Sequence, residues 1–174
     1  MMNSTKLIFR RNVMKITKIW MLVSLMALPF AAQSVQAAPL STLQEHFDTL
    51  GLGVALGGFD PVSYFPEGGG KAAKGFVKRD FKYKGVNYRF ASDANRDRFI
   101  ANPEKYLPAY NGWCAWAMAE LNAKVDVEPT SFEIYNGKLY VFYDHADLNT
   151  RALWLKNPKE MISKADTHWK KLAQ

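Results

Sequence analysis

Apolar and polar residues alternate in short runs through the middle of the chain. Phe81–Phe90 holds two such runs joined by Lys84-Gly85, and Phe132–Tyr143 holds two more around Asn136-Gly137. Alternation with a period of two is typical of strands, and a short glycine-containing link between two runs predicts an antiparallel hairpin. Upstream, Phe59–Phe65 also alternates and predicts a turn that leads into a strand.

Helical patterns separate and follow the predicted hairpins. We expect a helix over Ser92–Ile100 with the serine as its N-cap, and a further helical turn over Glu104–Tyr106. Gly112–Ala119 is apolar on all sides, which favours a buried helix. Of two helices near the C-terminus, the last begins at Asn157–Glu160, where a cap, a proline and a glutamate form a capping-box pattern. We find no internal repeat, and this mixture of elements predicts a small single α+β domain with a C-terminal helical segment.

The N-terminal region has the pattern of an export signal. A basic segment begins at Met14, which is also an alternative translation start, and the apolar run Ile19–Phe30 is too short to span a bilayer as a helix. Val35-Gln36-Ala37 then places small residues at the two positions that a signal peptidase reads. We therefore expect residues 1–37 to be removed as a signal peptide before Ala38, and the protein to be periplasmic or secreted.

The net charge changes once this signal is removed. The 174 residues carry a formal charge of +7, but five basic residues precede Ala38, which leaves 18 basic against 16 acidic residues, or +2. A nearly neutral domain has no broad charged surface for nucleic acid or anionic lipid, so neither is expected as a partner. Since no cysteine near Ala37 could carry a lipid, we expect no stable membrane anchor.

Residues 38–57 and 58–174 differ in pattern. The first segment contains a predicted short helix over Ser41–Leu50 and ends in a glycine-rich stretch, so we expect a lead-in that is flexible or lies across the domain. The second segment contains the predicted hairpins and is assigned as the folded domain. Because Cys114 is the single cysteine of the chain, no disulfide within the chain supports this fold.

The chemistry of Cys114 has two interpretations. Cys114 and Met118 are four residues apart, so in a helix their sulfur atoms share one face and suit Cu(I) or another soft ion. The candidates for a third ligand are His46, His145 and His168, each isolated in sequence, and the thioether of another methionine. We favour His145, because Asp144 beside it can orient the imidazole ring. The other interpretation is that both sulfur-containing residues pack in the core as ordinary apolar side chains.

Aromatic residues in the first half of the domain suggest a ligand cavity. We take four residues as candidates for binding, namely Asp60, Tyr64, Trp113 and Trp116. The alternative is that the aromatic side chains fill a small core and that Asp60 builds a turn. No spacing supports a catalytic triad, and no glycine-rich phosphate loop follows a strand, so the sequence does not predict an enzyme.

Three motifs resemble the YHS domain family, in the order in which that family has them. Gly58–Phe65 resembles the Asp-Pro-Val opening of the domain. Tyr88–Tyr106 resembles its core, an aromatic strand followed by a short helix that ends in Asn-Pro and a tyrosine. Gly112–Ala117 resembles a signature of the exported, stand-alone branch. The resemblance covers most of residues 58–170.

The resemblance implies a link to heavy-metal handling through cysteine and histidine ligands in a small zinc-finger-like fold. Those ligands would fall on Ser63, Ala91 and Asn95, none of which is a thiol or an imidazole. Because a thiolate makes such a site soft and tight, we expect the usual metal site of the family to be missing here.

Two hypotheses about function follow. The first is an exported, non-enzymatic binding protein, similar to YHS domains, that senses, buffers or delivers a transition metal such as copper or zinc. The second is a metal-free structural or interaction module that kept the scaffold after losing its metal ligands. The expected partner is accordingly a metal ion or a periplasmic protein.

Overall fold

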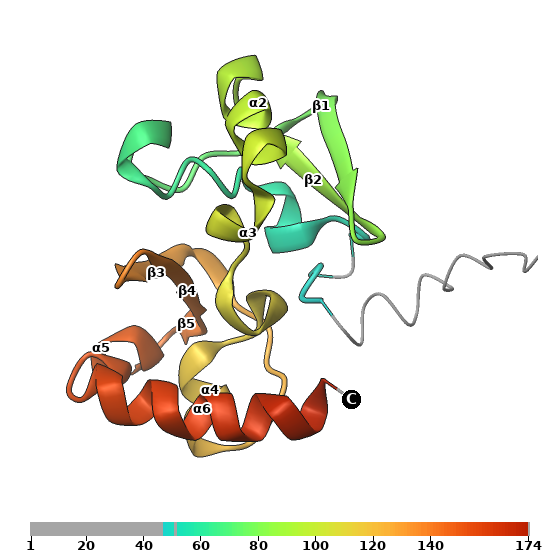
Figure 1. The fold of residues 1–174 in the computed structure, drawn as a ribbon. Coiled ribbons are helices and arrows are strands. Elements are labelled where there is room, and N and C mark those ends of the chain that lie inside the picture. Colours follow the sequence, from blue (N-terminus) through green and yellow to red (C-terminus); the bar gives the residue numbers. More distant parts are fainter. Residues whose placement is uncertain (1–46, 51, 174) are drawn as a thin grey trace, which may run out of the picture. The chain divides into compact units, whose positions relative to one another are not determined.

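The computed structural model describes residues 47–50 and 52–173, so the predicted signal peptide, its cleavage site and His46 lie outside the described residues. The described residues belong to one compact unit and form a small α+β domain, in which helices accompany three two-stranded antiparallel sheets (Figure 1). None of the helices in this part of the chain is long and apolar enough to cross a membrane.

The elements follow one another in two runs, each of which leads from a 3-10 segment through a hairpin to two helices. The first run consists of η1 (Ala55–Gly58), η2 (Pro66–Gly68), β1 (Phe76–Tyr83), β2 (Val86–Phe90), α2 (Asp93–Ala101) and α3 (Pro103–Tyr106). The second run consists of η3 (Ala109–Gly112), α4 (Ala115–Glu120), β3 (Glu128–Tyr135), β4 (Lys138–Phe142), β5 (Asp144–His145), β6 (Leu148–Asn149), α5 (Thr150–Trp154) and α6 (Pro158–Leu172). Both predicted hairpins, and the predicted helices at α2, α3 and the C-terminus, are confirmed.

Of the turn and the following strand expected over Phe59–Phe65, the turn is confirmed and the strand is wrong. The middle of this run forms turns instead of extended backbone. The Asp60 carboxylate accepts hydrogen bonds from the backbone amides of Val62 and Ser63, which folds the chain back on itself. Such bonds from a side chain to its own neighbours compete with a strand, even where the apolar pattern alternates.

Two helix starts differ from the expectation. The helix predicted over Gly112–Ala119 begins at Ala115, so Cys114 is its N-cap residue. At α6, the Asn157 side chain makes no capping bond to the backbone, and its amide donates to Glu160 Oε2 at 2.6 Å instead. The capping-box prediction is therefore right about where the helix begins and wrong about how its first residues are bonded.

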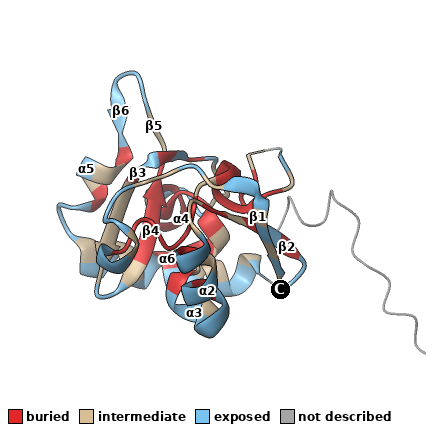
Figure 2. Cartoon of the chain, turned by 90° about the horizontal axis from the view of Figure 1, so that it is seen from above, coloured by how far each residue is buried: buried red, intermediate tan, exposed pale blue. Residues whose placement is uncertain are grey.

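The core consists of two clusters of buried side chains, one around Phe99 and one around Trp154. Figure 2 shows that burial is concentrated on β4 and α4, whereas the strands of the small β5–β6 hairpin are largely exposed. The first cluster includes Ala55 and Leu56, which are 4% and 0% exposed. Part of the segment 38–57 thus belongs to the core of the domain.

The two large hairpins share one sequence pattern and one geometry. Tyr83–Phe90 and Tyr135–Phe142 both read Tyr-x-Gly-x-x-Tyr-x-Phe. In both hairpins the pairing begins next to the two-residue link and shifts register at an irregularity in the first strand. Both links are left-handed, with φ of 47° and 85° at Lys84-Gly85 and 50° and 74° at Asn136-Gly137.

The helix after each hairpin places one buried aromatic ring on the second strand. Phe99 of α2 and Trp154 of α5 are both 0% exposed. Each packs on the tyrosine and the phenylalanine of the shared pattern. The ring centroids of the tyrosine pairs are 4.9 Å apart for Tyr88–Phe99 and 5.0 Å apart for Tyr140–Trp154, with interplanar angles of 35° and 37°. The centroids of the phenylalanine pairs are 5.2 Å apart for Phe90–Phe99 and 5.4 Å apart for Phe142–Trp154, with angles of 56° and 59°. The two halves therefore pack their aromatic residues in the same way.

The connections at the ends of each half also repeat. Asn102 and Asn157, each before a proline that starts a helix, have φ and ψ of −152° and 73° and of −151° and 71°. η1 and η3 each contain two consecutive left-handed residues. The two halves thus repeat a hairpin, its ring packing and these connections, so the expectation of no internal repeat is wrong, although the β5–β6 hairpin occurs in the second half alone among the described residues. Most positions differ in residue type between the halves, which hides the repeat in the sequence.

Candidate functional site

Asp60 is 0% exposed and its carboxylate accepts four hydrogen bonds. Oδ1 accepts from the backbone N–H of Val62 at 2.8 Å and of Ser63 at 3.3 Å. Oδ2 accepts from the backbone N–H of Ala91 at 2.9 Å and from the side-chain amide of Asn95 at 2.7 Å. Since these donors satisfy both oxygens, the buried carboxylate ties the turn after η1 to the start of α2.

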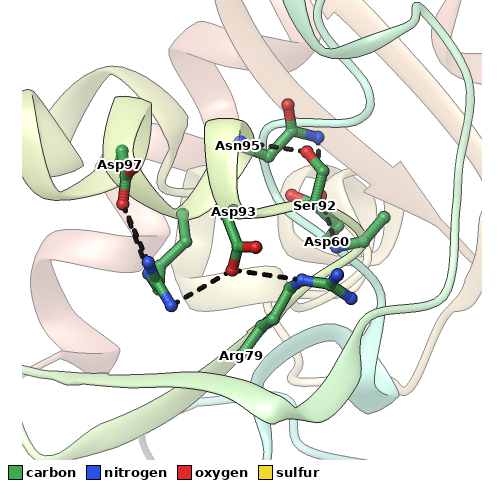
Figure 3. A network of polar contacts seen from close by, with 8 residues as sticks. Asp60, Arg79, Ser92, Asp93, Asn95 and Asp97 are labelled. Atoms are coloured by element: carbon green, nitrogen blue, oxygen red, sulfur yellow. Dashed lines mark hydrogen bonds and ion pairs between the residues drawn. The ribbon is translucent and has the colours of Figure 1, made fainter.

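Figure 3 shows how this network continues into α2. Ser92 Oγ accepts from the backbone N–H of Asn95 at 3.1 Å, which fixes the residue whose side chain reaches Asp60. Further out, Arg79 pairs with Asp93 at 3.2 Å. The Asp93 side chain is 63% exposed, so this ion pair contributes little to stability compared with the buried bonds.

The positions that the YHS resemblance assigns to metal ligands lie around the same carboxylate. Ser63 Oγ donates to the backbone carbonyl of Asp60 at 2.7 Å, and Ala91 and Asn95 donate to the Asp60 side chain. These positions direct N–H and O–H hydrogens toward Asp60, whereas a cation requires lone pairs. The cluster is therefore arranged to hold an anionic side chain.

Cys114 is 0% exposed and lies in a small hydrogen-bonded ring. Its sulfur accepts from the backbone N–H of Tyr143 at 3.3 Å and lies 3.5 Å from Thr150 Oγ1. The Thr150 hydroxyl donates to the backbone carbonyl of Tyr143 at 2.5 Å. Because that hydroxyl hydrogen is used, the thiol is the donor in the contact with Thr150. Cys114 thus has hydrogen-bond partners as a neutral thiol.

Cys114 has the same place in the second half that Asp60 has in the first. Each follows a glycine and an aromatic residue, and each accepts from the backbone N–H of the first residue after the second hairpin strand. Each also contacts a polar side chain in the first turn of the next helix. The corresponding pairs are Asp60 and Cys114, Ala91 and Tyr143, and Asn95 and Thr150.

The three residues predicted as soft-metal ligands occupy different environments. Met118 is 0% exposed in the Trp154 cluster, and its backbone N–H donates to the Cys114 carbonyl at 2.9 Å. His145 is exposed on β5. His168 Nδ1 lies 2.9 Å from the Met118 carbonyl oxygen. Among residues 47–50 and 52–173, no three His, Cys, Asp or Glu side chains are grouped so that they could hold a metal ion.

The aromatic binding candidates are divided between core and cavity walls. Tyr64 is 1% exposed, donates its hydroxyl to the Pro129 carbonyl at 3.0 Å and packs edge-on against Phe132 at 4.8 Å. Trp113 is 7% exposed, and its indole N–H has no hydrogen-bond partner among the described residues. Trp116 is partly buried beside Cys114. Tyr64 and Trp116 each line a cavity.

A cavity of about 580 Å³ opens at Tyr64 between the loop after η2 and the second half. Three of its lining residues are charged: Glu133 on β3, Asp144 on β5 and Arg151 on α5. The other lining residues are Tyr64, Pro66, Gly70, Thr130, Ser131, Phe132 and Ile134. Except for Tyr64, the sequence did not single out these lining residues, because they come from segments that lie far apart along the chain.

A smaller cavity of about 220 Å³ reaches Cys114. Its walls are mostly apolar and are formed by Trp116, Ala117, Leu121, Val125, Tyr143, Leu148 and Thr150. The thiol lies at the wall of this space, although its hydrogen-bonding capacity is used by Tyr143 and Thr150.

Asp48 is a second buried carboxyl that the sequence did not single out. It is 0% exposed, and its oxygens accept from the backbone N–H of Leu50 at 2.9 Å and of Val127 at 3.2 Å. Burial raises the pKa of Asp48 to about 7, although the hydrogen bond from Leu50 lowers it, and the nearby charge of Asp126 adds to the increase. Asp48 therefore attaches the start of the domain to the loop before β3 at an electrostatic cost.

Comparison of the chain with models of protein families, with curated proteins and with solved structures gives no match.

Proposed function

We propose that this chain is an exported, non-enzymatic binding protein of the YHS type, in which Asp60 and Cys114 stabilise the fold and no metal is needed. The observation that carries this proposal is the equivalence of the two residues. The same position of the fold is occupied by a carboxylate in the first half and by a thiol in the second. Each accepts a hydrogen bond from the corresponding backbone N–H, that of Ala91 or that of Tyr143. A role that either group can fill is that of a hydrogen-bond acceptor.

The hydrogen bonds around Cys114 support this role. A thiol must lose its proton to bind a soft metal ion, and it would then lose the bond that it donates to Thr150. Around Asp60, the positions implied as ligands by the YHS resemblance donate hydrogens inward. A cation at either place would have to displace contacts on which the fold depends.

A soft-metal site at Cys114 is the second candidate. In its favour, the thiol lines the cavity of about 220 Å³ and stands at the N-terminal end of α4, one helical turn from Met118. Copper or zinc bound there would take Cys114 as thiolate and Met118 as thioether, with a further ligand from a side chain such as His145.

Thiol labelling and metal analysis separate the two candidates. We would alkylate the native protein anaerobically with and without Cu(I), and measure copper and zinc in protein purified from the periplasm. Under our proposal, labelling of Cys114 is equally slow in both samples, becomes fast only on unfolding, and the dialysed protein is metal-free and folded. Stoichiometric metal that is lost in Cys114→Ser, together with labelling that Cu(I) slows, would establish the soft-metal site instead.

A further inference from the structure

We propose that the cavity at Tyr64 binds a small ligand that carries an ammonium group on an apolar body. This inference rests on the proposed binding function and names the class of ligand. It concerns a cavity other than the one at Cys114, formed by β3, β5, α5 and the segment around η2.

The charges of the cavity wall favour a cation. Arg151 donates from Nη2 and Nε to Glu133 Oε2 at 2.6 and 3.2 Å, so these two charges neutralise each other. Asp144 also lines the cavity, and its carboxylate has no ion pair among the described residues. The wall therefore keeps one uncompensated negative charge, which an ammonium group would neutralise.

Ser131 supplies an independent indication of a polar ligand. It is 7% exposed, it lines the cavity, and its hydroxyl has no hydrogen-bond partner in the described part of the chain. Buried hydroxyl groups are normally hydrogen-bonded, and those that are not call for a specific explanation. The Ser131 oxygen is itself closed to solvent, so a ligand N–H would reach it only after the Ser131 side chain rotates toward the cavity.

The rest of the wall fits a hydrocarbon body. Pro66, Phe132 and Ile134 contribute apolar surface, and the Tyr64 ring closes one side. The Tyr64 hydroxyl is used by the Pro129 carbonyl, and burial raises the pKa of Tyr64 above its ordinary value, so the ring stays neutral. Such a site combines a few polar groups with an apolar wall, as small-molecule sites commonly do.

Two kinds of ligand carry an ammonium group on an apolar body, namely a simple amine and an amino acid. Arg151 Nη1 is not used in the ion pair with Glu133, so it could also meet the carboxylate of an amino acid. Pentylamine, L-norleucine and hexanoate carry similar alkyl chains and differ in which charged groups they have. Calorimetric titration of each into the purified protein therefore distinguishes the two kinds of ligand.

We expect pentylamine, norleucine or both to bind at millimolar concentration or better, and hexanoate not to bind. Asp144→Asn should weaken amine binding about tenfold or more, because it removes a charge-assisted hydrogen bond. Asp147→Asn is the matched control, since Asp147 is exposed in the same hairpin and does not line the cavity. Tighter binding of norleucine would identify an amino acid as the ligand, and binding of pentylamine alone would identify an amine.

The inference is overturned if neither amine binds, if hexanoate binds as tightly as the amines, or if Asp144→Asn and Asp147→Asn bind equally well. Circular dichroism spectra of both variants confirm that they are folded before titration. Because metal content and thiol labelling are measured separately, a failure here leaves the metal-free role of Cys114 intact.

Discussion

Asp60 and Cys114 hold corresponding positions in the two halves of the domain, and each accepts a hydrogen bond from the backbone amide that follows a hairpin. The distances are 2.9 Å from Ala91 N to Asp60 Oδ2 and 3.3 Å from Tyr143 N to Cys114 Sγ. In each half, the bond joins the segment after a 3-10 turn to the end of the second hairpin strand, which is followed by α2 in the first half and by the small β5–β6 hairpin in the second. The two side chains therefore connect corresponding segments of the two halves, one through a carboxylate and the other through a thiol.

Replacing Asp60 by asparagine should destabilise the domain by about 2 to 3 kcal/mol. The amide NH₂ would face N–H donors where the carboxylate now accepts four hydrogen bonds. The free energy of unfolding in urea measures this loss. Asp97→Asn is a suitable control, because the Asp97 side chain is 66% exposed, and a change below about 0.5 kcal/mol is expected for it. Equal stability of the two variants would show that the Asp60 network is not important for folding.

The burial of Asp48 predicts that stability depends on pH. Its pKa is about 7 in the folded protein and near 3.8 when unfolded, so between these values the folded state binds more protons. The contribution of Asp48 to stability is therefore retained below about pH 4 and falls as pH rises toward 7, by up to about 4 kcal/mol in total.

The variant Asp48→Asn isolates this effect. Asparagine keeps only one acceptor oxygen for the two N–H donors of Leu50 and Val127, so the variant loses a hydrogen bond at every pH, but it cannot ionise. Urea unfolding at about pH 5 and about pH 8 should show the variant gaining stability relative to the original protein at the higher pH. A difference between the two proteins that is the same at both pH values would contradict the buried, protonated carboxyl.

The sequence predicted elements whose signals are local. Asn136-Gly137 and the glycine of Lys84-Gly85 marked the hairpin turns, because left-handed links favour glycine and asparagine. Ser92 marked the start of α2 because an N-cap acts within three residues. The turn at Asp60 was expected, but the strand after it was wrong, because the same alternation suits a strand when the hydrogen bonds of the carboxylate are unknown.

The site depended on contacts between distant segments. Asp60 meets Asn95, Cys114 meets Thr150, and the cavity at Tyr64 joins three segments, none of which a spacing rule predicts. The repeat was missed for a similar reason. Its two halves agree in backbone conformation and ring packing, whereas they share few side chains outside the Tyr-x-Gly-x-x-Tyr-x-Phe pattern.

The export prediction can be tested on the precursor. Processing before Ala38 should give a protein that osmotic shock releases, with Ala38 as its N-terminal residue. Leu25→Arg places a charge in the apolar run and should leave the precursor in the cytoplasm. The measurement is cell fractionation followed by N-terminal sequencing. A periplasmic form that retains residues before Met21 would disprove cleavage by a signal peptidase at this site.

The last prediction tests whether the positions of Asp60 and Cys114 are interchangeable. Cys114→Asp alone buries a carboxylate with too few donors and should be destabilising, because Thr150 gives its hydroxyl hydrogen to the Tyr143 carbonyl. Thr150→Asn alone loses that bond and should also be destabilising. In the double variant, the new asparagine amide can donate to the new carboxylate, as Asn95 does to Asp60.

We therefore expect a double-mutant cycle on the free energy of unfolding to give a favourable coupling of about 1 kcal/mol or more. Cys114→Asp combined with Thr167→Ala provides the control, since Thr167 is exposed on α6 and should show no coupling. Zero coupling in the Cys114→Asp and Thr150→Asn pair would mean that the halves share backbone geometry, but that the hydrogen bonds of Asp60 and Asn95 cannot form at the positions of Cys114 and Thr150. A favourable coupling would show that a carboxylate and its amide donor can occupy the positions of Cys114 and Thr150, as Asp60 and Asn95 do in the first half.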